Sequence, residues 1–251
     1  MKRGDSAALP LFYKSVVPVL YSRHEALSLS EAVDYRFACV ANSVPLAVTE
    51  FAYASRDYPI VFGEGARPVP FAVLGLRAAD NLFVDDRGAW ESGAYVPAYV
   101  RRYPFVLIEG AGDGSLMLGV DEESDKLIKG GGARLFKNGK ISAHVEQVLA
   151  FGKRFYDDIR VSQDFGEALR LAGVLVSNKA TINTESGEVL SLDGFSVIDK
   201  EAFNNLSDEI ILGWRRKGWL DLVYSHLLSV SSWRHLLERD SKKRKLIDGS
   251  R

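Results

Sequence analysis

The side chains best suited to acid–base chemistry or metal binding in this sequence are its four histidines, His24, His144, His226 and His235. A metal site on one helix needs two ligands three or four residues apart, because that spacing places both on one face. No pair of these histidines has it. His226 and His235 are nine residues apart, so on one helix they would point to opposite sides. We therefore predict no metal site and interpret His226 as a hydrogen-bonded histidine at the edge of the core.

Residues that could act as nucleophiles or bind phosphate lie in unfavourable surroundings. Cys39 lies in an apolar run, residues 37–41, where burial would raise the pKa of the thiol and hide it. The glycine-rich stretches 63–65 and 110–114 lack the following helix that a phosphate-binding loop requires, since the first is followed by Pro68 and Pro70 and the second by a predicted strand. The acidic run 121–125 lacks the spacing of a calcium-binding loop and is interpreted as solvated. No catalytic residue and no cofactor is predicted, and an enzyme is the less favoured interpretation.

One group of aromatic and basic residues has the composition of a binding surface. Tyr95, Tyr99 and Tyr103 follow one another at four-residue intervals, which places them on one side of a short helix together with the neighbouring arginines. Tyrosine and arginine are enriched at binding hot spots. In the alternative interpretation the arginines pair internally with Asp57 or Glu109 and the tyrosines pack on a sheet. The predicted partner-binding residues are Tyr95, Tyr99, Arg101, Arg102, Tyr103, Asp57 and Tyr58.

The positions of proline divide the chain into two differently built halves. All eight prolines lie at or before Pro104. Proline removes a backbone donor and restricts the residue before it, so we expect short strands and turns in this half. The front lobe, residues 1–120, is therefore expected to hold a small antiparallel or mixed sheet. Its predicted strands are 59–62, 70–76, 81–84 and the two arms of a hairpin, 105–109 and 116–120. A turn is predicted at 85–88, after the third of these strands.

The proline-free half is expected to be rich in helices. Ser142 and Ser207 each precede a stretch in which apolar residues recur every three or four positions, so both are predicted helix N-caps. A second helical segment is predicted past Gly166. Segments 180–183 and 189–192 flank a turn and predict a hairpin, with a further turn at Asp193 and Gly194. We therefore expect an α+β fold in a single domain, 1–251, with a strand-rich lobe packed against a helix-rich lobe. The expected parts are a strand-rich lobe, 1–120, a mobile loop, 121–140, a helix-rich lobe with the hairpin, 141–237, and a basic tail, 238–251.

Composition limits the class of protein. The 251 residues carry 32 basic and 33 acidic side chains, and 47% of them are apolar, which are the proportions of a soluble globular protein. A net charge near zero argues against nucleic-acid binding. The apolar runs are far shorter than the ~20 residues that span a bilayer, and no signal peptide is recognisable, so we expect a soluble, cytoplasmic protein. The basic tail is expected to be solvated or to make weak contact with an anionic surface.

Seven short segments, taken in order, carry a family resemblance. The longest is YVPAYVRRYPF at 95–105. The others are NSVPL at 42–46, DYPIVF at 57–62, LGLR at 74–77, NLFVD at 81–85, LSLDGF at 190–195 and LVYSHLLS at 222–229. Together they resemble the bacterial SapC family over nearly the whole chain. The resemblance departs at 136–140, where lysines stand in place of an expected acidic turn.

The resemblance implies a link to the paracrystalline surface layer and brings no catalytic motif. The resemblance also implies that family members are frequent neighbours of flavin-dependent tryptophan-halogenase-like proteins and TonB-dependent receptors. We therefore expect a noncatalytic binding or accessory protein whose partner is a peptide or protein linked to the surface layer or outer membrane. The alternative is an enzyme, or an enzyme subunit, that modifies peptides or amino acids. A structural surface-layer subunit is less favoured, because no secretion signal is recognisable.

Overall fold

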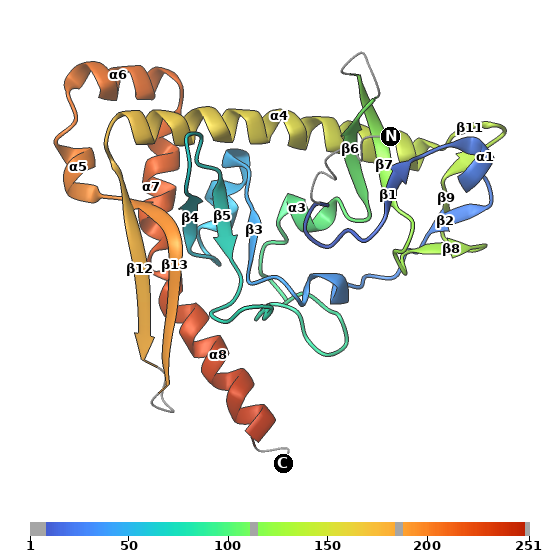
Figure 1. Cartoon of the computed structure of the whole chain (residues 1–251), viewed down its shortest axis with the longest axis horizontal. Helices are drawn as coiled ribbons and strands as arrows, with labels where there is room; N and C mark the ends of the chain where they lie inside the picture. Colours follow the sequence, from blue (N-terminus) through green and yellow to red (C-terminus); the bar gives the residue numbers. More distant parts are fainter. Residues whose placement is uncertain (1–8, 111–114, 184–187, 249–251) are drawn as a thin grey trace, which may run out of the picture. The chain divides into compact units, whose positions relative to one another are not determined.

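The computed structural model describes residues 9–110, 115–183 and 188–248 (Figure 1). The chain forms two compact units. Unit 1 contains Met1–Val33 and Arg101–Tyr156, and unit 2 contains Asp34–Val100 and Asp157–Arg251. Helices and small antiparallel sheets occur together, so the predicted α+β class is confirmed. The units do not coincide with the predicted consecutive lobes, since each contains residues from both halves of the sequence.

The first sheet of unit 1 contains the predicted hairpin. Strands β6 (Phe105–Glu109) and β7 (Leu116–Asp121) pair antiparallel, with Phe105 opposite Val120. The glycine-rich turn between them lies largely outside the described residues. Strand β1 (Val16–Pro18) pairs with the other side of β7, which gives the order β1-β7-β6.

The expected loop 121–140 contains four short strands. Two of them flank β2 (Leu27–Leu29) in a second three-stranded sheet, ordered β8-β2-β9. The reason is burial: Leu135 is fully buried and Phe136 is 7% exposed, and both belong to the core of unit 1 together with Phe105 and Val120. These strands have two or three residues each, too short to produce a periodic signal in the sequence. The strands of this segment are β8 (Leu127–Lys129), β9 (Ala133–Arg134), β10 (Phe136–Lys137) and β11 (Lys140–Ile141).

Helix α4 (Ala143–Leu171) contributes its first part to unit 1 and its second part to unit 2. Its predicted start is confirmed, because the hydroxyl of Ser142 accepts a hydrogen bond from the Val145 amide at 3.3 Å. The sequence predicted two helical segments separated at Gly166, yet the helix continues through it. A Cβ atom at Gly166 would lie 1.9 Å from the carbonyl oxygen of Pro68. Glycine is therefore needed for close packing, and it does not break the helix.

Unit 2 is built on a five-stranded antiparallel sheet, ordered β12-β13-β4-β5-β3. The hairpin of β12 and β13 joins β4 where Phe195 lies opposite Gly63. The expected turn at Gly194 is a bulge within β13, where the register shifts and Gly194 has a φ of +76°. Predicted strand 81–84 is absent from the sheet, and only Val84 forms a bridge, to Trp90. The strands are β3 (Ser43–Pro45), β4 (Ile60–Gly63), β5 (Pro70–Val73), β12 (Leu175–Asn183) and β13 (Val189–Ile198).

Aromatic rings from four elements form the core of unit 2. The ring of Phe165, on α4, lies 6.1 Å from Phe62, 6.3 Å from Phe51 and 5.6 Å from Trp219. Helices α7 and α8, orange to red in Figure 1, complete the unit. None of the described helices combines the length and hydrophobicity that crossing a bilayer requires. The remaining helices are α1 (Tyr21–His24), η1 (Arg36–Ala38), η2 (Val48–Glu50), α2 (Phe51–Ala54), α3 (Ala98–Arg101), α5 (Lys200–Asn204), α6 (Asp208–Arg216), α7 (Trp219–Ser229) and α8 (Ser232–Asp248).

Candidate functional site: a groove between a loop and the last helix

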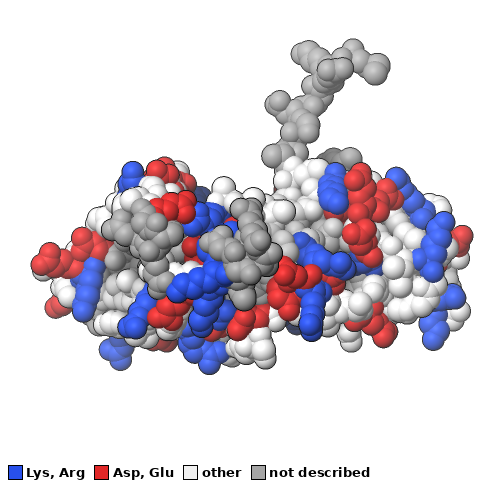
Figure 2. Space-filling view, turned by 90° about the horizontal axis from the view of Figure 1, so that it is seen from below, with Lys and Arg blue, Asp and Glu red and all other residues white. Residues whose placement is uncertain are grey.

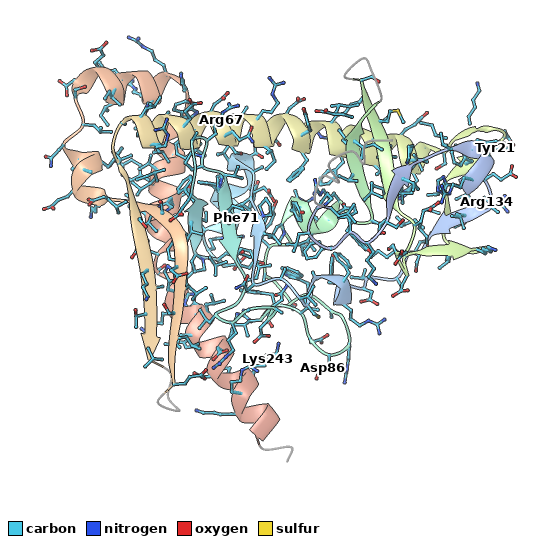
Figure 3. The ribbon with its side chains drawn as sticks, in the orientation of Figure 1. Tyr21, Arg67, Phe71, Asp86, Arg134 and Lys243 are labelled. Carbon is cyan, nitrogen blue, oxygen red and sulfur yellow. The ribbon has the colours of Figure 1, made fainter. Side chains whose placement is uncertain are left out.

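The candidate site is a groove of about 720 Å³ in unit 2, between the loop 82–92 and helix α8. Figure 3 labels Asp86 on the loop and Lys243 on the helix. Both residues line the groove. The other lining residues are Leu82, Phe83, Val84, Asp85, Ala89, Trp90, Glu91, Ser92, His235, Glu238, Arg239 and Lys242.

A tight turn fixes the shape of the loop. The Asp85 carboxylate accepts hydrogen bonds from the amides of Arg87, at 2.9 Å, and Ala89, at 2.8 Å. Gly88 has a φ of +81°, a conformation that glycine adopts without strain. The turn expected from the sequence is thus present, and it brings Val84 and Trp90 together as a bridge.

The floor of the groove is aromatic and rigid. The rings of Phe83 and Trp90 are stacked at 6.2 Å and are almost fully buried. Below them the indole N–H of Trp90 donates to the Tyr58 hydroxyl oxygen at 3.1 Å, and the Tyr58 hydroxyl donates to the Tyr95 carbonyl. Burial raises the pKa of Tyr58, so its hydroxyl stays protonated and available as a donor. The guanidinium of Arg239 lies 4.5 Å from the centre of the Phe83 ring, a cation–π contact.

The two walls of the groove carry opposite charges. The α8 wall consists of His235, Glu238, Arg239, Lys242 and Lys243, and the first four lie at spacings that share one helix face. The loop wall consists of Asp85, Asp86 and Glu91. One ion pair joins the walls, between Arg239 Nη1 and a Glu91 carboxylate oxygen at 3.1 Å. The groove is therefore mainly basic along the helix and acidic along the loop.

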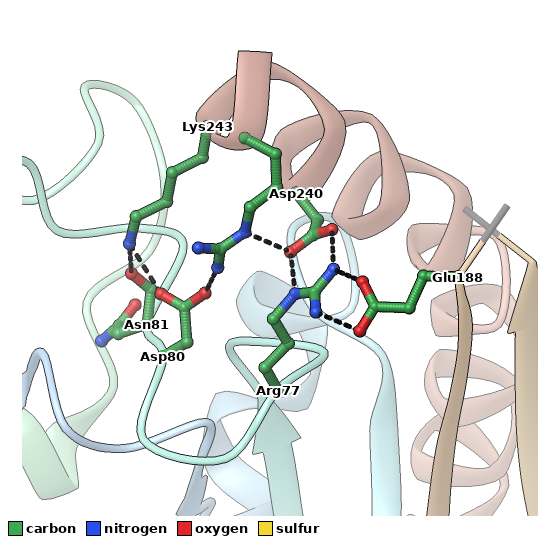
Figure 4. A network of polar contacts seen from close by, with 7 residues as sticks. Arg77, Asp80, Asn81, Glu188, Asp240 and Lys243 are labelled. Carbon is green, nitrogen blue, oxygen red and sulfur yellow. Dashed lines mark hydrogen bonds and ion pairs between the residues drawn. The ribbon is translucent and has the colours of Figure 1, made fainter. Parts of the chain in front are cut away.

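Helix α8 is held in place by a group of six charged residues, which we call the clamp (Figure 4). Its centre is Asp240, whose side chain is 2% exposed. Arg77 reaches Asp240 with Nε at 3.2 Å and Glu188 with Nη2 at 2.7 Å. These hydrogen bonds, first to Glu188 and then to Asp240, raise the pKa of Arg77. The clamp residues are Arg77, Asp80, Glu188, Asp240, Lys243 and Arg244.

The second half of the clamp uses residues of the expected basic tail. Lys243 Nζ lies 2.6 Å from Asp80 and donates to the carbonyl of Asn81 at 3.3 Å. Arg244 pairs with Asp80 and lies 3.5 Å from Asp240. Lys243 and Arg244, which belong to the run of basic residues 242–245, are thus engaged inside unit 2. The internal pairing of these basic residues was not predicted from the sequence, because Asp80 and Asp240 are far apart along the chain and form no local motif.

Comparison with known proteins supplies the family. The family model for SapC matches residues 21–236. The chain belongs to the SapC family. The matched range contains the loop 82–92 and the first turn of α8, while the clamp residues of α8 lie beyond it. No curated protein matches the chain, and no solved structure matches it either.

The predicted partner-binding residues of unit 2 are mostly engaged within it. The hydroxyl of Tyr95 donates to the buried Glu50 carboxylate at 2.9 Å, and the Tyr95 amide donates to Asp57 at 2.8 Å. Tyr58 is fully buried and Tyr99 is 6% exposed. The rings of Tyr58 and Tyr99 are therefore core and floor elements, as in the internal alternative.

The predicted residues of unit 1 lie around the start of β6. The guanidinium of Arg102 lies 5.1 Å from the centre of the Phe155 ring, and that of Arg101 lies 5.2 Å from Phe151. Tyr103 donates to the fully buried Asp121 at 3.1 Å, and burial raises the pKa of Tyr103 to about 12. Arg101 is exposed, so contact of this residue with a partner stays a prediction.

Two of the four histidines are buried side chains. His24 is fully buried, with Nε2 3.1 Å from a Glu122 carboxylate oxygen. His226 is also fully buried, packed 5.4 Å from the Phe62 ring, and burial lowers its pKa to about 4. Neither nitrogen of His226 has a hydrogen-bond partner in the described structure, so the hydrogen bond expected from the sequence is absent. Among the described residues no three histidine, cysteine or carboxylate side chains gather as a metal site.

Unit 1 has a hollow of its own, with a volume of about 820 Å³. Tyr21 and Arg134, both labelled in Figure 3, lie on its sides. The strand residues 136–137 and the start of α4 complete it. Its charged side chains are exposed, and the buried ring of Phe136 also lines it.

Proposed function

We propose that the protein is a noncatalytic binding protein that holds a peptide, or an extended segment of a protein, in the groove of unit 2. The observation that carries the proposal is the groove itself: a buried aromatic floor between two walls of opposite charge. Its volume of about 720 Å³ is in the range of ligand-binding clefts. A floor of tryptophan and phenylalanine beside an arginine also has the composition of a binding hot spot.

Rigidity supports the proposal. Binding loses affinity when side chains and loops must be ordered at the same time. The turn at Asp85 fixes one wall of the groove, and the clamp around Asp240 fixes the other. A partner would therefore meet a site that is already in shape.

The partner that we propose is a peptide or protein linked to the surface layer or to the outer membrane. Membership of the SapC family is what supports this direction. The location that we propose for the chain is the cytoplasm. Cell fractionation with an antibody against the protein tests it, and recovery in the envelope fraction would contradict it.

Selection of peptides from a random library tests the binding function. Phage displaying random dodecapeptides are selected on the immobilised full chain, and the affinities of the recovered peptides are measured by calorimetry. The variant Ala89→Trp fills the groove, because Ala89 is exposed and lines it. The matched control is Ala52→Trp, on an exposed position of α2 outside the groove.

We expect the selected peptides to lose at least tenfold in affinity on Ala89→Trp and to bind Ala52→Trp as they bind the unchanged chain. Peptides that bind Ala89→Trp equally well would remove the groove from consideration. Arg102→Ala in the same assay tests the patch predicted from the sequence. Because Arg102 packs on Phe155 inside unit 1, we expect this substitution to leave the affinity unchanged.

A further inference from the structure

The arrangement of charge in the groove specifies the chemistry of its partner. This inference rests on the proposed function and concerns the same site. The α8 wall and the loop wall face the same space with opposite signs. What a partner meets depends on which of these charges are already neutralised inside the protein.

Along α8, Lys242 is the cation that remains available. Lys243 is held by Asp80 at 2.6 Å, and Arg239 is held by Glu91 at 3.1 Å. Lys242 is exposed, and its side chain has no hydrogen bond or ion pair with any described residue. The Glu238 carboxylate, one turn earlier on the same wall, is paired with Arg234 at 3.1 Å. An acidic group of a partner would therefore meet an ammonium that is not paired with any described carboxylate of the protein.

Along the loop, Asp86 is the equivalent anion. The Asp85 carboxylate is used by the turn, where it accepts from the amides of Arg87 and Ala89, and Glu91 is used by Arg239. Asp86 is exposed, and within the described part of the chain its carboxylate has no hydrogen bond or ion pair. The groove thus offers one free charge of each sign, on opposite walls.

Charge is mixed on the surface as well. On the face drawn in Figure 2, the described acidic and basic side chains are interspersed. Long-range attraction of a strongly charged partner is therefore weak, and local complementarity decides what binds.

We propose that the groove binds a peptide segment that carries both charges, with its carboxylate beside Lys242 on α8 and its ammonium or guanidinium beside Asp86 on the loop. A segment with only acidic groups would bring one of them against Asp85 and Asp86. A segment with only basic groups would bring one against Lys242 and Arg239. Each meets like charge on one wall, whereas the mixed segment meets opposite charge on both.

Three synthetic peptides test the proposal on the full chain. All are acetylated and amidated nonapeptides with a central tryptophan, glycine spacers and an uncharged fluorophore. One carries two lysines before the tryptophan and two glutamates after it, one carries four glutamates, and one carries four lysines. We expect the mixed peptide to bind about tenfold tighter than either other peptide by fluorescence anisotropy. Tightest binding by the acidic or the basic peptide, or equal or absent binding of all three, would overturn the proposal.

Charge reversal at the two walls supplies an independent test of the proposal. Asp86→Lys and Lys242→Glu should each weaken the mixed peptide by about tenfold, while the double variant should restore its affinity, because the peptide can bind in the reverse direction. A single-charge site gives another result, since one reversal would then weaken binding and the other would strengthen it. Lys179→Glu is the control for net charge, because Lys179 is exposed on β12 and does not line the groove. Both wall residues are exposed, so the variants should fold, which circular dichroism verifies.

The two proposals fail in different ways. The random library could yield peptides that lose affinity on Ala89→Trp but carry only one sign of charge. In that case the binding function stands and the mixed-charge inference falls. If no selected peptide depends on Ala89, the binding function itself falls.

Discussion

Replacing Asp240 by asparagine should destabilise unit 2 by removing the buried charge at the centre of the clamp. Loss of one partner from a buried ion pair typically destabilises a protein by about 3–5 kcal/mol. Arg77 keeps Glu188 as a partner, and its side chain is 23% exposed, so water compensates part of the loss. We therefore expect roughly half of that range, about 2 kcal/mol. For a chain of this size the melting temperature should fall by about 4–8 °C.

Tryptophan fluorescence during thermal unfolding measures this effect selectively, because all four tryptophans belong to unit 2. Glu188→Gln is the matched control: it removes a carboxylate from the same arginine, but Glu188 is 50% exposed. Exposed ion pairs contribute about 1 kcal/mol or less, so the control should melt within about 3 °C of the unchanged protein. An Asp240→Asn variant as stable as the control would refute the role given to burial in the clamp.

Three further predictions concern the interior of unit 2. Burial lowers the pKa of His226 from 6.5 to about 4, so as pH falls the unfolded chain binds the proton before the folded chain does. The free energy of unfolding, measured in urea, should therefore drop by about 2 kcal/mol between pH 7 and pH 5. The variant His226→Leu should flatten this pH dependence. Gly166→Ala should destabilise unit 2 by about 2 kcal/mol or more, because the added Cβ would meet the Pro68 carbonyl. At Gly213 an added Cβ meets nothing within 4 Å, so Gly213→Ala should be neutral or stabilising by up to about 1 kcal/mol. Equal melting temperatures for the two alanine variants would count against the packing argument. Tyr95→Phe removes one donor to the buried Glu50 and should lower the free energy of unfolding by about 1–2 kcal/mol, and an unchanged urea midpoint would show that this bond is not stabilising.

Local features of the structure were accessible from the sequence. The hairpin of β6 and β7 was predicted by two apolar runs around a glycine-rich turn, and these runs form its two strands. The start of α4 was predicted by Ser142, whose hydroxyl accepts a hydrogen bond from the backbone amide of Val145. The turn at Asp85–Gly88 was also predicted, because aspartate and glycine satisfy its backbone geometry. In each case the interaction joins residues close in sequence.

Features that depend on distant segments were not accessible. Sequence patterns do not show that β13 pairs with β4, although this pairing builds the sheet of unit 2. The clamp joins Asp80 to α8, and nothing local distinguishes its lysines from solvated ones. The same holds for the groove, since Phe83 and Arg239 meet only in the fold. The tyrosines of the predicted patch were selected by composition, and burial gives Tyr58 and Tyr99 internal roles instead.

The most direct test of the groove as the binding site is photo-crosslinking of a selected peptide that contains a diazirine-bearing leucine, followed by mass spectrometry of the full chain. We predict crosslinks to the loop 82–92 and to residues 235–243 of α8, and their loss on Ala89→Trp. Crosslinks to residues 95–103 or to unit 1, unchanged by Ala89→Trp, would contradict the account.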